Sequence, residues 1–127
     1  VVISYGIGFI PGRQKSIPQD LISLASENGK DLIKLRIEDL LFIKSAGNYV
    51  EVFIKHGEET KKQLLRNSLK SLEENETLRP LLVRSHRSSL VNPVNVARVI
   101  QSKGKMELEL KSIVIPVSSK YESNFLD

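Results

Sequence analysis

The side chains with the most chemistry in this 127-residue chain lie at residues 84–89, with the sequence RSHRSS. A histidine among serines could belong to a hydrolase site, which would need a deep pocket around His86 with an acid beside it. The chain contains no G-x-S-x-G nucleophile elbow, and no carboxylate lies close in sequence to orient the imidazole. We therefore expect no enzyme, and we expect His86 to order its turn by hydrogen bonding.

Arg87 in the same segment suggests a different chemistry. A guanidinium can donate two hydrogen bonds to O6 and N7 of guanine in the major groove of DNA, and a lysine can contact the same acceptors less rigidly. The net charge of +4 also favours polyanionic partners, because binding them releases counterions. Charge alone does not decide the matter, since many basic domains bind no nucleic acid.

Other cations fit two interpretations, a field that attracts phosphate or simple solubilising residues on strand surfaces. These cations are Lys44, Lys61, Lys62, Arg66, Arg84, Lys103 and Lys105.

Metal and cofactor sites find no support in the sequence. The chain has two histidines, His56 and His86, in different expected turns, and it has no cysteine. Gly47, Gly57 and Gly104 are isolated turn glycines and do not form a phosphate-binding loop. We expect no metal and no cofactor, and the lack of cysteine fits a reducing cytoplasm.

The first twenty residues differ in composition from the rest. Residues 1–10, VVISYGIGFI, are apolar but too few for a spanning helix of about 20 residues. They fit a strand or packed linker, or else the trailing end of a membrane segment. Residues 11–19 contain two prolines and a glycine, which is typical of a linker. We expect residues 1–20 to be a linker or the tail of an upstream region in a longer protein, and residues 21–127 to be one domain.

Alternation and turn residues predict a series of short strands. Asn28-Gly29 separates two apolar runs within residues 21–37, which predicts a hairpin because glycine supplies the positive φ of a tight turn. Residues 40–45 and 49–55 flank Gly47-Asn48 and predict a second hairpin. Within the latter strand, positions 50, 52 and 54 face one side and 49, 51 and 53 the other.

The second half continues this pattern with two short helices. Residues 60–65 read as a solvent-facing edge strand, followed by a helix capped by Asn67 or Ser68, with leucines at 65, 69 and 72 on one stripe. Ser119 and Glu122 match a capping box, which predicts a closing helix. The other strands are expected at residues 81–83, 90–91, 96–101, 106–110 and 113–117, with residues 84–89 as a basic loop. The fold class is mainly β, with two small helices.

Three segments together resemble the LytTR DNA-binding domain of bacterial transcription regulators. They are EDLLFIKSAGNYVEVF at 38–53, LLVRSHRSSLVNPVNVARV at 81–99 and IPVSSKY at 115–121. The resemblance covers roughly residues 21–126. It implies an elongated array of stacked antiparallel sheets of short strands, whose loops contact successive major grooves of double-stranded promoter DNA at paired repeats. It also implies fusion to an upstream receiver or membrane sensor region, a cytoplasmic location and a possible dimer on DNA.

The resemblance also implies which residues contact DNA. These are Asn48 and Tyr49 in the first loop, His86, Arg87 and Ser88 in the central loop, and Ser119 and Lys120 in the last. Asn48 could pair with an adenine edge, whereas Tyr49 could bind phosphate or stack on sugar, so the base reader of this loop stays open. Lys120 stands where the family more commonly has arginine.

Two rival functions make different predictions. A binder of single strands would use Phe42, Tyr49, Phe53 and Tyr121 as stacking platforms, although aromatic residues on strands are more often core. A protein-interaction or sensor-coupling module would use the basic face for an acidic partner. Its binding would depend on residues 1–10 and survive neutralisation of Arg87 and Lys120, whereas DNA binding predicts the reverse.

Overall fold

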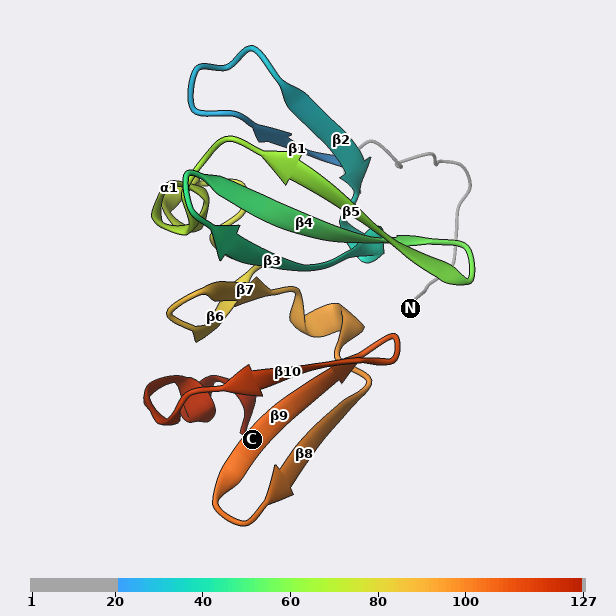
Figure 1. The fold of residues 1–127 in the computed structure, drawn as a ribbon, viewed down its shortest axis with the longest axis vertical. Coiled ribbons are helices and arrows are strands. Elements are labelled where there is room, and N and C mark those ends of the chain that lie inside the picture. Colours follow the sequence, from blue (N-terminus) through green and yellow to red (C-terminus); the bar gives the residue numbers. More distant parts are fainter. Residues whose placement is uncertain (1–20, 127) are drawn as a thin grey trace, which may run out of the picture.

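The computed structural model describes residues 21–126, which form three antiparallel sheets. The sheets follow one another along the longest axis of the molecule, with a five-stranded sheet between a two-stranded and a three-stranded one (Figure 1). The predicted fold class, mainly β with stacked antiparallel sheets and small helices, is confirmed. The linker expected at residues 1–20 lies outside the described residues.

The two-stranded sheet is the predicted first hairpin, made of β1 (Leu21–Ala25) and β2 (Leu32–Arg36). Its turn contains Gly29 at φ 75°, in the left-handed region that glycine adopts without strain. Ile22 and Leu24 face the five-stranded sheet and are buried, while Leu21 points to solvent. The hairpin therefore covers one face of the central sheet.

The five-stranded sheet has the order β5-β4-β3-β7-β6. Its strands are β3 (Leu40–Ala46), β4 (Tyr49–His56), β5 (Glu59–Leu65), β6 (Val83–His86) and β7 (Ser89–Val91). The second hairpin is confirmed, with β3 and β4 joined through Gly47-Asn48, and β5 is an edge strand as predicted.

Side chains alternate across this sheet, so it contributes to two cores. Val50 and Val52 are buried in the core beneath the first hairpin and helix α1 (Leu69–Glu74). Phe42 and Phe53 face the opposite side, where their rings stack at 4.3 Å between centroids. The strand periodicity of residues 49–55 predicted this division correctly.

The three-stranded sheet covers that second core. It consists of β8 (Arg98–Ser102), β9 (Lys105–Leu110) and β10 (Ile113–Val117), in the order β10-β9-β8. Met106, Leu108 and Leu110 are buried against the aromatic pair of the central sheet. Two 3-10 turns, η2 (Ile37–Asp39) and η3 (Pro93–Asn95), lead into β3 and toward β8.

The predicted central loop was too long. Strand β6 reaches His86 and β7 begins at Ser89, so Arg87 and Ser88 alone form the turn. The expected strand at residues 81–83 was correspondingly misplaced, because the N–H groups of Leu81 and Leu82 donate to the carbonyl of Leu78 in a turn. A local run of polar residues does not disclose that β7 pairs with β3 and continues the sheet.

The two helix predictions have different outcomes. Helix α1 is capped by Ser68, one of the two predicted caps, whose Oγ accepts from the Ser71 N–H at 3.1 Å. Leu65 belongs to the predicted edge strand, β5, and precedes the helix. The closing helix is a 3-10 helix, η4 (Ser119–Phe125), with Ser118 as its N-cap and no side-chain cap. The capping box is therefore wrong, because an N-cap at Ser118 places Tyr121 and not Glu122 at the third helical position.

Candidate nucleic-acid interface

The three predicted DNA-contacting segments lie along one edge of the molecule. The Ser45 N–H donates to the Ser88 carbonyl at 2.9 Å, which joins the end of β3 to the β6–β7 turn. The Ser118 N–H donates to the Ser85 carbonyl at 3.0 Å, which joins the end of β10 to β6. In Figure 1 the β3–β4 turn, the β6–β7 turn and η4 all lie on the left side. Segments far apart in sequence thus form one row.

The first turn of this row presents Asn48 and Tyr49 to solvent. Gly47 precedes them at φ 66°, which reverses the chain within two residues. The Tyr49 side chain is engaged from the side, because the Arg66 guanidinium carbon lies 5.7 Å from the ring centroid. Hydrogen bonding to Tyr49, and next to Glu27, raises the pKa of Arg66 above its ordinary value. Because a guanidinium stays protonated in proteins, Arg66 places a positive charge beside Tyr49.

In the central turn, His86 orders the backbone and leaves Arg87 free. The His86 Nδ1 accepts from the Ser88 N–H at 3.2 Å and lies 2.9 Å from the Ser88 Oγ. Since a backbone N–H can only donate, Nδ1 is the acceptor in its contact with the Ser88 backbone. Arg87 is exposed, and its guanidinium has no hydrogen-bond or ion-pair partner among residues 21–126. Such a side chain can reach a ligand without first breaking a contact.

The last segment adds exposed polar groups to the same edge. Ser119 and Lys120 are exposed, and the Lys120 Nζ lies 5.4 Å from the centroid of the Tyr121 ring. The β8–β9 turn is close by, because Gly104 and Lys105 line one hollow together with Ser118 and Ser119. The row thus extends beyond the three predicted segments.

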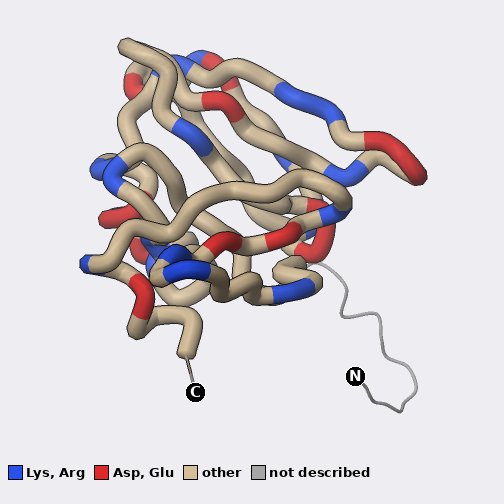
Figure 2. Tube along the Cα trace, turned by 60° about the horizontal axis from the view of Figure 1, so that its bottom comes forward, with Lys and Arg blue, Asp and Glu red and all other residues tan. Residues whose placement is uncertain are grey.

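The cations of the sequence separate into engaged and free groups. Arg84 is 14% exposed and forms an ion pair with Glu73, and the Lys62 Nζ lies 3.3 Å from a Glu51 oxygen. Lys44, Lys61, Lys103 and Lys105 are exposed without a described partner in residues 21–126. Figure 2 shows cations and carboxylates interspersed over the strands, so charge alone does not delimit the candidate interface.

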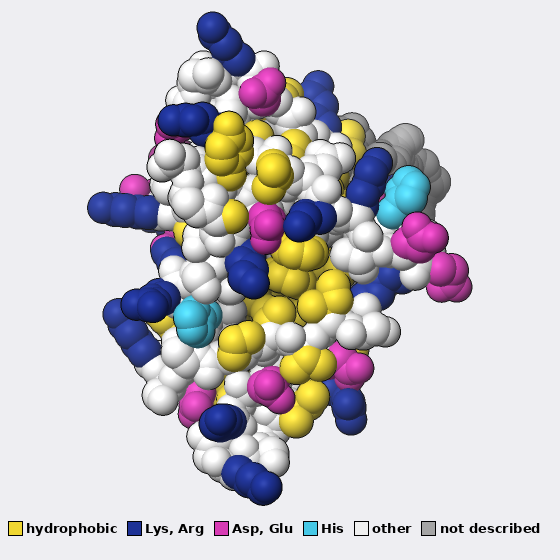
Figure 3. All heavy atoms as spheres, in the orientation of Figure 1, with side chains coloured by type: hydrophobic (Ala, Val, Ile, Leu, Met, Phe, Trp, Pro, Cys, Tyr) yellow, Lys and Arg dark blue, Asp and Glu magenta, His cyan; other side chains and the backbone are white. Residues whose placement is uncertain are grey.

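A hollow of about 350 Å³ beside His86 tests the hydrolase interpretation. It lies between the five-stranded and three-stranded sheets, where Figure 3 shows apolar side chains gathered in the middle of the face. Aromatic and aliphatic residues such as Phe42 and Ile113 line it, with Lys44 and Ser88 at its edge, and no Asp or Glu is among the lining residues. The acid that hydrolysis would require next to His86 is not in this lining. Within residues 21–126, no cluster of three potential metal ligands is present.

The stacking platforms expected of a single-strand binder are only partly available. Phe42 is 2% exposed, and its partner Phe53 packs against the same core. Tyr49 and Tyr121 remain accessible, but on separate segments of the edge. Two of the four aromatic residues are therefore core.

Comparison with known proteins decides the family. The family model of the LytTr DNA-binding domain matches residues 30–127. The chain belongs to the LytTR family. It is thus a DNA-binding domain of the type found in response regulators, as the resemblance of its three segments predicted.

Two related proteins agree with this assignment. An uncharacterized response regulatory protein of Vibrio cholerae is 28% identical over 113 residues, an alignment that covers 85% of this chain and 41% of that protein. The LytTr DNA-binding domain of a Bacillus cereus protein shares the fold, with a TM-score of 0.57 at 20% identity, covering 84% of this chain and 93% of that chain. The chain thus spans less than half the length of its Vibrio relative.

Sequence reasoning missed one feature of the LytTR site. It counted Arg84 among cations that could attract phosphate, whereas the structure engages Arg84 with Glu73 and with the Arg87 carbonyl. Residues 73 and 84 lie on different elements, a helix and a strand, so no helical or strand spacing relates them. Only the tertiary arrangement identifies the pair.

Proposed function

We propose that this LytTR domain recognises specific double-stranded promoter DNA, with its three turns entering successive major grooves at promoter repeats. Arg87 and Lys120 read base edges, Asn48 or Tyr49 contacts the DNA from the first turn, and His86, Ser88 and Ser119 complete the surface. The observation that carries the proposal is the pair of backbone hydrogen bonds, Ser45 to Ser88 and Ser118 to Ser85, that aligns these turns.

The proposal extends to the protein as a whole. The domain acts in a cytoplasmic transcription regulator that is not an enzyme, downstream of a receiver or membrane sensor region. The size of the Vibrio relative, of which this chain covers 41%, supports an additional region. Within residues 21–126, no helix is long and apolar enough to cross a membrane. Two copies occupy paired repeats, side by side or as a dimer.

Selection of enriched sequences from random duplex DNA tests the proposal directly. We expect an enriched repeat, and Arg87→Ala should weaken binding to it by ~1–3 kcal/mol and relax the preference at one base pair. Arg98→Ala is the control, because it removes an equally charged, exposed side chain from β8. An unchanged base preference after Arg87→Ala would contradict its reading role.

A failure of the selection would favour the rival function. If all duplexes bind equally, or none is enriched, the protein-interaction module becomes the better explanation. The next target would then be residues 1–10, whose apolar side chains that module would use.

A further inference from the structure

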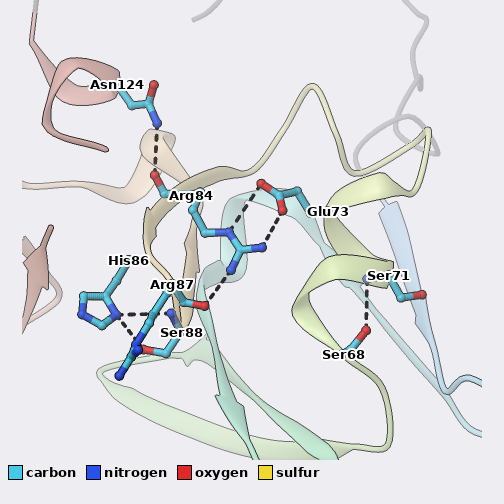
Figure 4. Close-up of polar contacts among 8 residues, drawn as sticks. All are labelled: Ser68, Ser71, Glu73, Arg84, His86, Arg87, Ser88 and Asn124. Atoms are coloured by element: carbon cyan, nitrogen blue, oxygen red, sulfur yellow. Dashed lines mark hydrogen bonds and ion pairs between the residues drawn. The ribbon is translucent and has the colours of Figure 1, made fainter. Parts of the chain in front are cut away.

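Arg84 connects helix α1 to the central turn of the DNA-binding edge. Its Nη2 donates to Glu73 Oε1 at 2.5 Å, and its Nε donates to Glu73 Oε2 at 3.5 Å. Its Nη1 donates to the backbone carbonyl of Arg87 at 2.8 Å. Figure 4 shows the guanidinium between the helix and the turn. One planar group therefore ties the Arg87 backbone to a carboxylate on a separate element.

Glu73 is itself held in place by its helix. Ser68 caps α1, and Leu69 and Leu72 are buried in the core beneath the first hairpin. The Arg84 side chain is 14% exposed, so its ion pair with Glu73 is shielded from water more than the other described pairs. A shielded, bidentate contact fixes both distance and orientation of the guanidinium.

The strand that carries Arg84 is fixed from its other side as well. The Asn124 Nδ2 in η4 donates to the Arg84 carbonyl at 3.2 Å. The backbone of β6 thus lies between the last segment and the helix. The helix therefore contacts the turn through Arg84, whose guanidinium binds both Glu73 and the Arg87 carbonyl.

We infer that Glu73 is a positioning residue for DNA recognition, acting through Arg84 to set the direction in which Arg87 leaves the turn. This inference rests on the proposed function of Arg87. A bidentate contact to guanine needs the guanidinium in the plane of the base, and positioning errors above ~0.5 Å degrade such a contact. Glu73 is not required to touch DNA.

Simple electrostatics predicts the opposite outcome of removing this carboxylate. Without Glu73 the domain loses a negative charge and Arg84 is released as a cation, which strengthens binding to every duplex. Positioning instead predicts weaker binding to the selected site alone. The sign of the effect on the selected site distinguishes the two.

The test compares Glu73→Gln with the matched control Glu74→Gln, an exposed neighbour on the same helix. The affinities of the whole chain for its selected duplex and for a scrambled duplex are measured. We expect Glu73→Gln to lower the ratio of the affinity for the selected duplex to that for the scrambled duplex roughly tenfold. This is the effect of one lost charge-assisted hydrogen bond. Glu74→Gln should leave the ratio unchanged. In an Arg87→Ala background, Glu73→Gln should not lower the ratio further.

A measurement without DNA tests whether Glu73 holds the Arg84 guanidinium in place. The Arg84 Nε–H resonance should be protected from solvent exchange in the wild type and in Glu74→Gln, and lose that protection in Glu73→Gln. Thermal unfolding of each variant shows that it is folded.

Two outcomes would overturn the inference. One is an unchanged ratio in Glu73→Gln, as an equal loss for both duplexes would give, and the other is a loss that persists undiminished without Arg87. If the wild type itself selects no sequence, the proposed function fails first and the inference falls with it.

Discussion

At the scale of single residues, Asn48 and Tyr49 compete for the role of base reader in the first turn. The Tyr49 ring is already engaged by Arg66, whose own charge is held there by Glu27. Asn48 is exposed and its amide has no described partner within residues 21–126. A side-chain amide can make two hydrogen bonds to adenine, whereas a phenol beside a guanidinium suits phosphate.

We therefore predict that Asn48→Ala changes the base preference at one position and costs ~1–3 kcal/mol on the selected site. Tyr49→Phe keeps the ring under Arg66 and removes only the hydroxyl, so it should weaken all duplexes alike. Parallel selections with both variants measure the difference. A changed base preference in Tyr49→Phe, with none in Asn48→Ala, would reverse the assignment.

The same turns show how far residue types predict a site. The types and order of residues 84–89 predicted that His86 orders its turn by hydrogen bonding, and its contact with the Ser88 N–H confirms this. The same residue types predict that Arg87 reads DNA, and its side chain is exposed. They also suggested that Arg84 was available to phosphate, which is wrong because its partner Glu73 comes from a helix elsewhere in the chain. A side chain's chemistry can be read locally, but whether a partner already occupies it cannot.

At the scale of elements, Asn92 fastens the end of β7 to the start of β3. Its side chain is completely buried, and its Nδ2 donates to the carbonyls of Ile37 at 2.8 Å and Leu40 at 2.9 Å. Its backbone N–H donates to the Leu41 carbonyl at 3.0 Å. No local pattern in the sequence indicates this role, because the acceptors of Asn92 lie more than fifty positions away.

We predict that Asn92→Asp lowers the free energy of unfolding by ~3 kcal/mol. A carboxylate cannot donate to the two carbonyls, and the buried site opposes its charge. Asn95→Asp is the matched control, because the Asn95 side chain also donates to Leu40 but is only partly buried. Urea denaturation measures the free energy of unfolding of both variants. An equal decrease in the two would show that the complete burial of Asn92 adds nothing to the cost of the substitution.

Element ends were the part of the fold that sequence predicted least well. The alternation in residues 49–55 and 106–110 gave the right faces, since burial follows directly from a period of two. The capping box failed by one residue, because the Ser118 N–H is bound by the Ser85 carbonyl and Ser118 becomes the N-cap. Such end points depend on contacts between strands, which no local pattern contains.

At the scale of the whole molecule, the charges at the two ends of β4 differ. Tyr49 and Arg66 lie at one end, with the turns predicted to contact DNA, while Glu58 and Glu59 lie at the β4–β5 turn at the other. Figure 2 shows this acidic turn at the tip of the hairpin. Because a polyanion is attracted to cations and repelled by carboxylates, we expect these charges to orient the domain on DNA before any base is read.

If the domain binds DNA in this orientation, the contribution of a lysine to DNA affinity depends on where it lies as well as on its charge. Lys120→Ala should weaken the selected complex and reduce the slope of log affinity against log salt by about one, if its ammonium displaces a counterion from DNA. Lys61→Ala removes the same charge from an exposed site on β5, toward the acidic turn, and should leave the slope unchanged. Titrations of the selected duplex at several salt concentrations measure both slopes. Equal reductions would mean that the domain responds to its net charge, and the edge formed by the three turns would then not be the surface that faces DNA.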